Sequence, residues 1–307
     1  MRRISIISLA LLLGLVGCAS KPTTTIRSGS EVVPPRMTKR QIAKPAQEPP
    51  GEQVPIKDQG ATFTLFVPQG YQPKGDDAEL AVHFHGAAWF AIREHLRAGR
   101  TTPLLSIYLG EGSTAYRNGF HDVNRLPRLL KAVSEELRLR TGKRLRIASL
   151  DVSSYSAGYG AVRELVRSPD NVKLIRRIVL ADSLYASYGP DDKPDEEHIS
   201  PWVPFTEAAT QGNKVFVLTY SQVPTTGYAS SAECARALCL KLGVPLRKIV
   251  YNANQIPAAG DYPLVERADQ AHFHAWGYWG TDADAHMAHT RHLAEIWEAL
   301  EAPGAAK

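Results

Sequence analysis

The sequence predicts an α/β fold with a mostly parallel central sheet that is covered by helices on both faces. From residue 59 onward, short apolar runs alternate with stretches of helical periodicity, which is the pattern of strand–helix–strand crossover units. The chain has 307 residues and shows no internal repeat. Once the N-terminal segments are set aside, this length fits one domain of about 250 residues.

The expected elements follow one another regularly along the body of the chain. Short apolar runs predict strands at 61–68, 79–86, 104–110, 145–153, 172–183 and 213–221. Helical periodicity predicts helices at 87–99, 123–142, 157–168, 229–243 and 282–301. Gly142 is placed to end the second of these helices. We expect a loop at 111–120 and an irregular insert without helices at 184–212.

The first 17 residues are predicted to be a signal peptide. The positive start Met-Arg-Arg precedes an apolar run of about 14 residues, which is short for a membrane-spanning helix. The run ends in Leu-Val-Gly-Cys, with Cys18 last. This ending resembles the bacterial lipobox, which implies cleavage before Cys18 and a lipid such as palmitate on its thiol. Ala19 is similar to the residue that follows the cysteine in outer-membrane lipoproteins. The alternative is a plain signal peptide with an incidental cysteine.

Residues 18–58 are predicted to be a lipidated cysteine followed by a disordered tether. The segment is rich in Pro, Thr, Ser and charge, and no sustained apolar period runs through it. A tether of this kind would hold a catalytic domain, residues 59–307, away from a membrane in the bacterial cell envelope.

The charge pattern does not indicate a nucleic-acid partner. The formal net charge is +5, and Arg2 and Arg3 of the predicted signal peptide contribute to it. No basic stripe of the kind that binds nucleic acid is evident in the body of the chain. The sequence gives no indication of the oligomeric state.

Two cysteines, Cys234 and Cys239, lie in the predicted helix 229–243. Five residues of helix separate two positions by about 7.5 Å along the axis, too far for an unstrained disulfide bond. We therefore expect two free, partly buried thiols, with a disulfide possible only if the helix frays.

A candidate nucleophile lies where a predicted strand passes into a predicted helix. The run Ser154-Tyr155-Ser156-Ala157-Gly158 resembles the nucleophile elbow G-x-S-x-G of the α/β-hydrolases, with Ser154 in place of the first glycine. The resemblance implies the α/β-hydrolase fold, an esterase- or lipase-like activity and Ser156 as the nucleophile. The alternative is a serine-rich helix N-cap.

A candidate oxyanion hole follows the predicted strand 79–86. His83-Phe84-His85-Gly86 is similar to the His-Gly motif that closes the corresponding strand of such hydrolases. The resemblance implies that the amides of Ala157 and of Gly86 or Ala87 bind the oxyanion, with His85 orienting the loop. Residues 64–73 look like the early strand and turn of secreted esterases, so the resemblance extends over roughly 60–305.

The resemblance implies a carboxylate and then a histidine, in that chain order. The acid usually follows the second strand after the nucleophile, but residues 214–226 contain none. Asp182 ends the preceding strand and is our candidate, since Asp151 lies on the nucleophile strand itself. For the base we favour His286, because it lies in the first turn of the final helix.

Other histidines compete with His286 for the role of base. His289 lies on the same face of the predicted helix as His286. His274 alternates with His272 in the strand-like run Ala-His-Phe-His-Ala-Trp.

The sequence thus predicts a lipid-anchored serine hydrolase that acts on an ester or related acyl bond of a small-molecule or acyl substrate. No cofactor is required. Residues that could line the acyl pocket are His85, Trp89, Tyr116, Tyr155 and Tyr185. One alternative is a metal-dependent hydrolase that uses the His-x-His pairs, but common zinc signatures are absent. The other is a binding lipoprotein that has the hydrolase fold without the chemistry.

Overall fold

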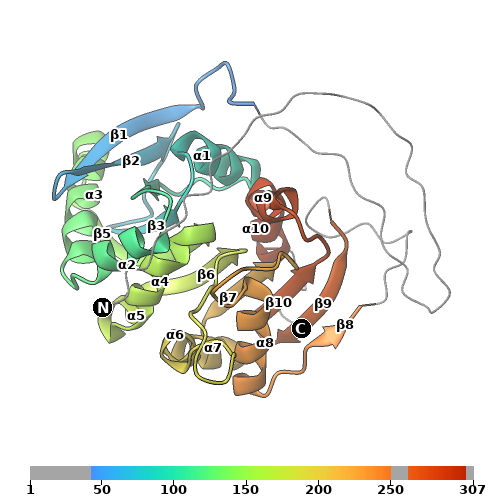
Figure 1. The fold of residues 1–307 in the computed structure, drawn as a ribbon. Helices are drawn as coiled ribbons and strands as arrows, with labels where there is room; N and C mark the ends of the chain where they lie inside the picture. Colours follow the sequence, from blue (N-terminus) through green and yellow to red (C-terminus); the bar gives the residue numbers. More distant parts are fainter. Residues whose placement is uncertain (1–42, 250–261, 302–307) are drawn as a thin grey trace. The chain divides into compact units, whose positions relative to one another are not determined.

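The computed structural model describes residues 43–249 and 262–301. Within them, one sheet has the strand order β1-β2-β4-β3-β5-β6-β7-β10-β9-β8 (Figure 1). The strands are β1 (Gly51–Asp58), β2 (Ala61–Pro68), β3 (Asp77–Phe84), β4 (Leu104–Ile107), β5 (Arg146–Tyr155), β6 (Ile175–Ala181), β7 (Val215–Tyr220), β8 (Arg247–Lys248), β9 (Leu264–Gln270) and β10 (Phe273–Tyr278).

The middle of the sheet is parallel and both of its ends are antiparallel. Strands β4, β3, β5, β6, β7 and β10 run parallel to one another. Strands β1 and β2 at one end, and β9 and β8 at the other, pair antiparallel. With helices on both faces, this is the α/β-hydrolase fold, and the predicted fold class is confirmed.

Helices cover both faces of the sheet. They are α1 (Ala88–Arg97), α2 (Ser113–Phe120), α3 (Arg125–Thr141), α4 (Tyr159–Val166), α5 (Pro169–Leu174), α6 (Glu196–Ile199), α7 (Val203–Thr210), α8 (Ser231–Leu242), α9 (Ala283–Arg291) and α10 (Leu293–Glu301), with the 3₁₀ turns η1 (Ser156–Gly158) and η2 (Ser200–Trp202). Helices α1 and α10 pack on one face, and α3, α4, α7 and α8 lie on the other (Figure 1).

Strand β6 shows how the two faces are filled. Ile178 and Leu180 belong to the larger core beneath α4 and α8, whereas Val179 and Ala181 belong to the smaller core beneath α10. Successive strand residues point to opposite faces, so a strand that is covered on both sides becomes a continuous apolar run. This is why β6 was recognisable in the sequence.

The predicted tether boundary at residue 58 is wrong for its last eight residues. Residues 51–58 form β1, which pairs with β2 along its whole length. Val54 and Ile56 are buried while Pro55 between them is exposed. Proline is tolerated there because β1 is an edge strand. The remaining calls on the N-terminus, from the signal peptide to Cys18, lie outside the described residues.

Two predicted irregular segments contain helices. Residues 111–120, expected to be a loop, hold α2; its Asn118-Gly119 pair is typical of a turn, but Gly119 is where Arg125 and Leu109 pack closely. The insert 184–212 holds α6, η2 and α7. Two of its four prolines, Pro201 and Pro204, occupy the first turns of η2 and α7, where the missing N–H has no partner to lose.

The final helix is two helices. The expected helix 282–301 is broken at His292, between α9 and α10. The buried carboxylate of Glu94 in α1 accepts a hydrogen bond from the Ala294 amide, 3.2 Å away. This carboxylate gives the first turn of α10 a partner for its free N–H groups.

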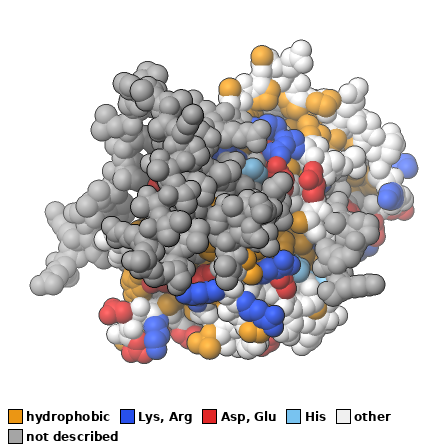
Figure 2. Space-filling view, turned by 90° about the vertical axis from the view of Figure 1, so that its right-hand side faces the viewer, with side chains coloured by type: hydrophobic (Ala, Val, Ile, Leu, Met, Phe, Trp, Pro, Cys, Tyr) orange, Lys and Arg blue, Asp and Glu red, His pale blue; other side chains and the backbone are white. Residues whose placement is uncertain are grey.

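Other features of the described residues follow the sequence. Gly142 ends α3 in the left-handed conformation, with φ +69°, as predicted. Cys234 and Cys239 lie on α8 as free, buried thiols. No helix in the described part of the chain has the length and apolar character needed to cross a membrane. On the face seen in Figure 2, acidic and basic side chains of the described surface are interspersed.

Candidate active site

Ser156 lies on a sharp turn between β5 and α4. The strand ends at Tyr155, and Ser156 has φ +47°, in the left-handed region. A Cβ atom at Gly158 would lie 2.4 Å from the carbonyl oxygen of Phe84 in β3, so no side chain fits there. The turn therefore raises Ser156 at the carboxyl edge of the sheet, and the glycine lets α4 begin close against β3.

His286 links Ser156 to Asp182. His286 Nε2 lies 2.9 Å from Ser156 Oγ, and His286 Nδ1 lies 2.8 Å from Asp182 Oδ2. The ionised carboxylate can only accept, so Nδ1–H donates to it and Nε2 is left to accept the Ser156 hydroxyl proton. A serine held by this histidine tautomer has a base in place for its proton.

Asp182 is buried and ionised. It follows β6, has φ +44° and is 1% exposed. Burial by itself raises the pKa of a carboxyl group, but the hydrogen bond from His286 and the nearby His289 outweigh it, so the pKa of Asp182 lies below its ordinary value. Ser221 Oγ donates a second hydrogen bond to Asp182 Oδ2, at 2.6 Å.

Ser221 is a site residue that the sequence analysis missed. It stands directly after β7, where the resemblance places the acid and where this chain has none. Its hydroxyl instead supports the carboxylate supplied one strand earlier. The short segment from Tyr220 to Val223 gives no signal of this role, because the contact joins positions 39 residues apart.

Aromatic rings pack on both sides of His286. The Tyr155 ring stacks on it with centroids 4.7 Å apart and planes at 29°. Tyr185 meets the imidazole edge-on at 6.5 Å. On its other side Tyr155 stacks on His85 at 5.8 Å, and His85 stacks on Tyr108 at the same distance. This row of rings connects the candidate base with the loop that follows β3.

The loop after β3 is held in a strained conformation. His85 has φ +74° and Gly86 has φ +98°. His83 Nε2–H donates to the His85 carbonyl at 2.9 Å, and His83 Nδ1 lies 2.8 Å from Ser153 Oγ. Burial lowers the pKa of His83 to about 4, so this ring is neutral near pH 7. Its fixed tautomer pins the peptide group between His85 and Gly86, which carries the Gly86 amide.

The residues predicted to line the pocket lie at different distances from His286. Tyr155 and Tyr185 touch His286, as described above. Tyr116 is fully buried behind His85, where its hydroxyl lies 3.0 Å from His85 Nδ1 and accepts the Leu109 amide. Trp89 lies on α1, half-buried against Phe90. Gly158, the residue after Ala157, packs against Phe84 at the end of β3, two residues before Gly86.

The competing histidines have other partners. His274 in β10 lies 2.5 Å from Asp269 in β9. His289 is buried, its Nδ1 lies 2.8 Å from Thr219 Oγ1, and burial lowers its pKa to about 4. Asp151 is 4% exposed and forms an ion pair with Arg100 within the protein. The structure therefore brings His286, and neither of the other two histidines, within hydrogen-bonding distance of Ser156.

The His-x-His pairs do not converge on a common point. Both ring nitrogens of His83 already have protein partners, and His274 Nδ1 is engaged by Asp269. Among residues 43–249 and 262–301, no three His, Cys, Asp or Glu side chains are grouped as metal ligands.

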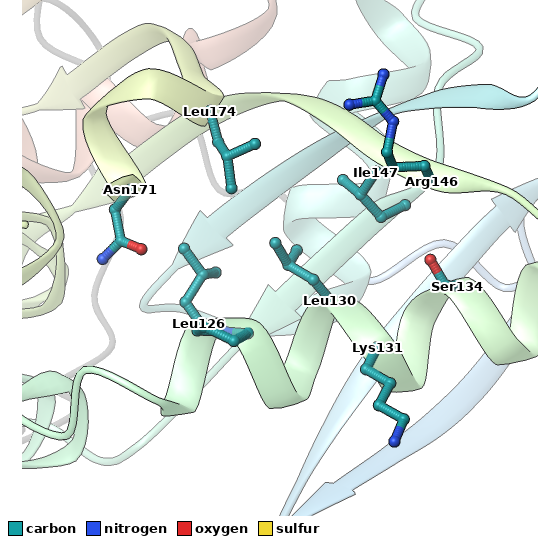
Figure 3. Close-up of a pocket in the computed structure, with 9 residues that line it drawn as sticks. Leu126, Leu130, Lys131, Ser134, Arg146, Ile147, Asn171 and Leu174 are labelled. Carbon is teal, nitrogen blue, oxygen red and sulfur yellow. The ribbon is translucent and has the colours of Figure 1, made fainter. Parts of the chain in front are cut away.

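A groove of about 300 Å³ lies away from this site (Figure 3). It is formed by α3, α5 and the start of β5, and Leu126, Leu130, Ile147 and Leu174 provide its apolar lining. Ser156 follows the opposite end of β5, and the strand's rise of about 3.3 Å per residue puts the two ends far apart. None of the predicted site residues lines the groove.

Comparison with known proteins adds structural likeness only. No family model matches the sequence, and no curated protein matches it. Similar solved structures include a poly(3-hydroxybutyrate) depolymerase from Bordetella parapertussis, at 13% identity and a TM-score of 0.46, covering 84% of this chain and 92% of that one. A carboxylesterase from Bacillus subtilis aligns at 7% identity and a TM-score of 0.43, covering 83% of this chain and 92% of that one. An esterase from Pyrobaculum calidifontis aligns at 12% identity and 0.41, covering 82% and 85%. At these identities, function has to be argued from the site itself.

Proposed function

We propose that the protein is a serine hydrolase that cleaves an ester or a related acyl bond. The observation that carries this proposal is the hydrogen-bonded series Ser156–His286–Asp182, with distances of 2.9 and 2.8 Å between the linked atoms. Its members come from three separate segments of the chain, and the serine lies on a strained turn at the sheet edge. This arrangement matches the roles of a catalytic triad.

The proposed reaction proceeds through an acyl-enzyme. Ser156 Oγ attacks the substrate carbonyl carbon while His286 Nε2 takes the hydroxyl proton, and Asp182 stabilises the imidazolium. The amides of Ala157 and of Gly86 or Ala87 would bind the developing oxyanion. The intermediate expels the alcohol, which receives the proton from His286. Water then attacks the acyl group by the same steps and restores Ser156. The mechanism calls for no cofactor.

Labelling by a fluorophosphonate probe tests the proposal. The wild-type protein should be labelled and should hydrolyse p-nitrophenyl acetate, and Ser156→Ala should lose both properties. Ser187→Ala is the matched control, because Ser187 is exposed in the neighbouring insert and forms no part of the proposed site. Hydrolysis that persists in Ser156→Ala but is lost on chelation would instead indicate metal chemistry. No labelling and no turnover in the wild type would indicate a binding protein.

The substrate is proposed to bind beside the aromatic rings around His286. Tyr155 and Tyr185 contact that ring directly. His85 lies on the loop after β3, where Tyr116 of α2 supports it from behind, and Trp89 lies on α1. Aromatic and apolar walls favour an acyl substrate with apolar surface. Hydrolysis of p-nitrophenyl esters of increasing acyl length would measure how much room the site offers.

We also propose that the protein is anchored by lipid on Cys18 in the bacterial cell envelope, at the outer membrane. The support is the sequence Leu-Val-Gly-Cys-Ala after a short apolar run. Full-length protein should incorporate labelled palmitate and sediment with membranes. Cys18→Ser should do neither, and a soluble, unlabelled wild-type protein would overturn the anchor.

A further inference from the structure

We propose that Ser154 and Ser183 form a clamp that holds the main chain of Ser156 in its strained conformation. The inference rests on the proposed function, since it assigns positioning roles at the same site. Ser154 Oγ and Ser183 Oγ lie 2.8 Å apart, and Ser183 Oγ lies 2.8 Å from the carbonyl oxygen of Ser156. Ser154 and Ser183 are both completely buried.

The direction of both hydrogen bonds is fixed. A carbonyl oxygen can only accept, so Ser183 gives its single hydroxyl proton to Ser156. Ser183 Oγ has no second proton, so Ser154 must be the donor in the bond between the two hydroxyls. The order is therefore Ser154 to Ser183 to the Ser156 carbonyl. A buried series with only one arrangement of protons restrains the groups that it joins.

The clamp connects the turn of the nucleophile with the turn of the acid. Tyr155 in β5 is paired with Ala181 in β6, so the two strands leave the sheet at the same level. The residue that follows each strand has a left-handed backbone conformation: Ser156 after β5 has φ +47°, and Asp182 after β6 has φ +44°. Ser183 reaches from the second turn to the first. It thus sets the separation of the two residues between which His286 must fit.

The clamp also explains why the elbow has serine where the family pattern has its first glycine. Ser154 lies inside β5 with strand geometry, so its main chain does not need a glycine. Its side chain has a partner in Ser183. Gly158 is different, because a Cβ there would lie 2.4 Å from the Phe84 carbonyl oxygen. The first glycine of the pattern is therefore replaceable in this chain, while the last is not.

Removing the clamp should slow acylation without weakening substrate binding. Ser183→Ala should lower kcat for p-nitrophenyl acetate and the rate of fluorophosphonate inactivation by about tenfold or more, since small displacements of a reacting group are costly. KM should stay unchanged. Ser154→Gly restores the family glycine and should nevertheless be slower than wild type. The double variant Ser154→Ala/Ser183→Ala should be no slower than Ser183→Ala, because Ser154 acts only through Ser183.

Ser134→Ala is the matched control. Ser134 Oγ also donates to a backbone carbonyl, that of Leu145 at 2.8 Å, but on α3. Ser134→Ala and Ser183→Ala each lose one hydroxyl-to-carbonyl hydrogen bond, but Ser183→Ala also leaves the buried Ser154 hydroxyl without its acceptor, so its midpoint of urea unfolding should shift somewhat more. Only Ser183→Ala should have a lower kcat and a slower inactivation by the fluorophosphonate. Equal rates in these two variants would overturn the clamp.

Crystal structures of the wild type and Ser183→Ala separate the clamp from the proposed function. The clamp predicts that the Ser156 carbonyl rotates and that φ leaves the value near +47° in the variant. An unchanged Ser156 main chain, with inactivation within about twofold of wild type, would overturn it. If the wild type reacts with no probe, the hydrolase proposal fails, and the clamp is then judged by the Ser156 main chain alone.

Discussion

Three residues of the candidate active site hold backbone angles that non-glycine residues seldom adopt. His85, Ser156 and Asp182 have φ of +74°, +47° and +44°, and each directly follows a parallel strand. Such residues cost on the order of 1–3 kcal/mol each. Each of the three is held by a hydrogen bond to its main chain. His83 donates to the His85 carbonyl, and Ser183 donates to the Ser156 carbonyl. The Asp182 amide donates to the Thr219 carbonyl.

Replacing His286 should remove hydrolysis while replacing His274 should not. His286→Ala takes away the only described histidine that reaches Ser156 Oγ, and we expect kcat/KM to fall by about 10⁴-fold. His274→Ala removes a ring that is paired with Asp269 in a neighbouring strand and should change kcat/KM by less than about fivefold. Steady-state kinetics on one ester, with both variants checked for folding by circular dichroism, makes the comparison. A loss of comparable size in the two variants would contradict the assignment of the base.

The sequence indicated the main groups of the site but not what supports them. Ser156 and His286 stand out through local pattern, the elbow and the first turn of a late helix. Asp182 could be chosen because the strand that normally supplies the acid has none. Ser183 and Ser221 carry no such pattern. Their roles depend on contacts across 27 and 39 residues, which only the folded chain brings together.

A buried ion pair joins β5 to the segment after α1. Arg100 and Asp151 lie 2.5 Å apart with side chains only 6% and 4% exposed. Arg100 also stacks over Trp297 of α10, with the guanidinium carbon 4.1 Å from the ring centre. Burial raises the pKa of the Asp151 carboxyl, but Arg176, Arg100 and Arg177 outweigh it and leave the pKa below its ordinary value. Through Arg100, the segment that follows α1 is therefore linked both to Asp151 in β5 and to Trp297 in α10.

Asp151→Ala should destabilise the protein strongly. It leaves the Arg100 charge buried without its carboxylate, so the free energy of unfolding should fall by about 3–5 kcal/mol. Asp77→Ala is the control, because the pair of Asp77 with Arg146 is largely exposed and should be worth less than about 1 kcal/mol. Urea unfolding followed by tryptophan fluorescence measures both. Similar losses in the two variants would show that the buried pair has no special importance.

Buried parallel strands were predictable, and edge or insert elements were not. β6 and β7 are covered on both faces and therefore contain continuous apolar runs, at 178–181 and 215–218. β1 shows only a short alternation of buried and exposed residues, with Pro55 in the middle of it. β9 has a single buried residue, Ala268. Two helical elements of the insert, η2 and α7, have a proline in their first turn, and proline by itself suggests a loop. These elements are held by what they pack against more than by their own composition.

Three buried histidines make the stability of the whole protein sensitive to pH. Burial lowers the pKa of His83, His95 and His289 to about 4 in each case, against 6.5 in the unfolded chain. The unfolded state therefore takes up these protons first as the pH falls. Their contribution is fully present above about pH 6.5 and is lost as the pH approaches 4.

We expect the free energy of unfolding to fall between pH 7 and pH 5. Each of the three histidines should contribute a slope that approaches about 1.4 kcal/mol per pH unit. His95→Gln keeps a donor for the Thr102 carbonyl but cannot titrate. The slope of its free energy of unfolding against pH should therefore be smaller by the contribution of one proton, at most about 1.4 kcal/mol per pH unit. Urea unfolding at several pH values provides the test, and a wild-type slope in His95→Gln would refute it.

The candidate base is separated from the serine by 130 positions in the chain. His286 lies on α9, which follows the last strand of the described sheet. In the unfolded chain the serine, the imidazole and the carboxylate therefore have no reason to meet, and the proposed site does not exist before the chain has folded. We therefore expect the proposed hydrolytic activity to arise only on completion of folding.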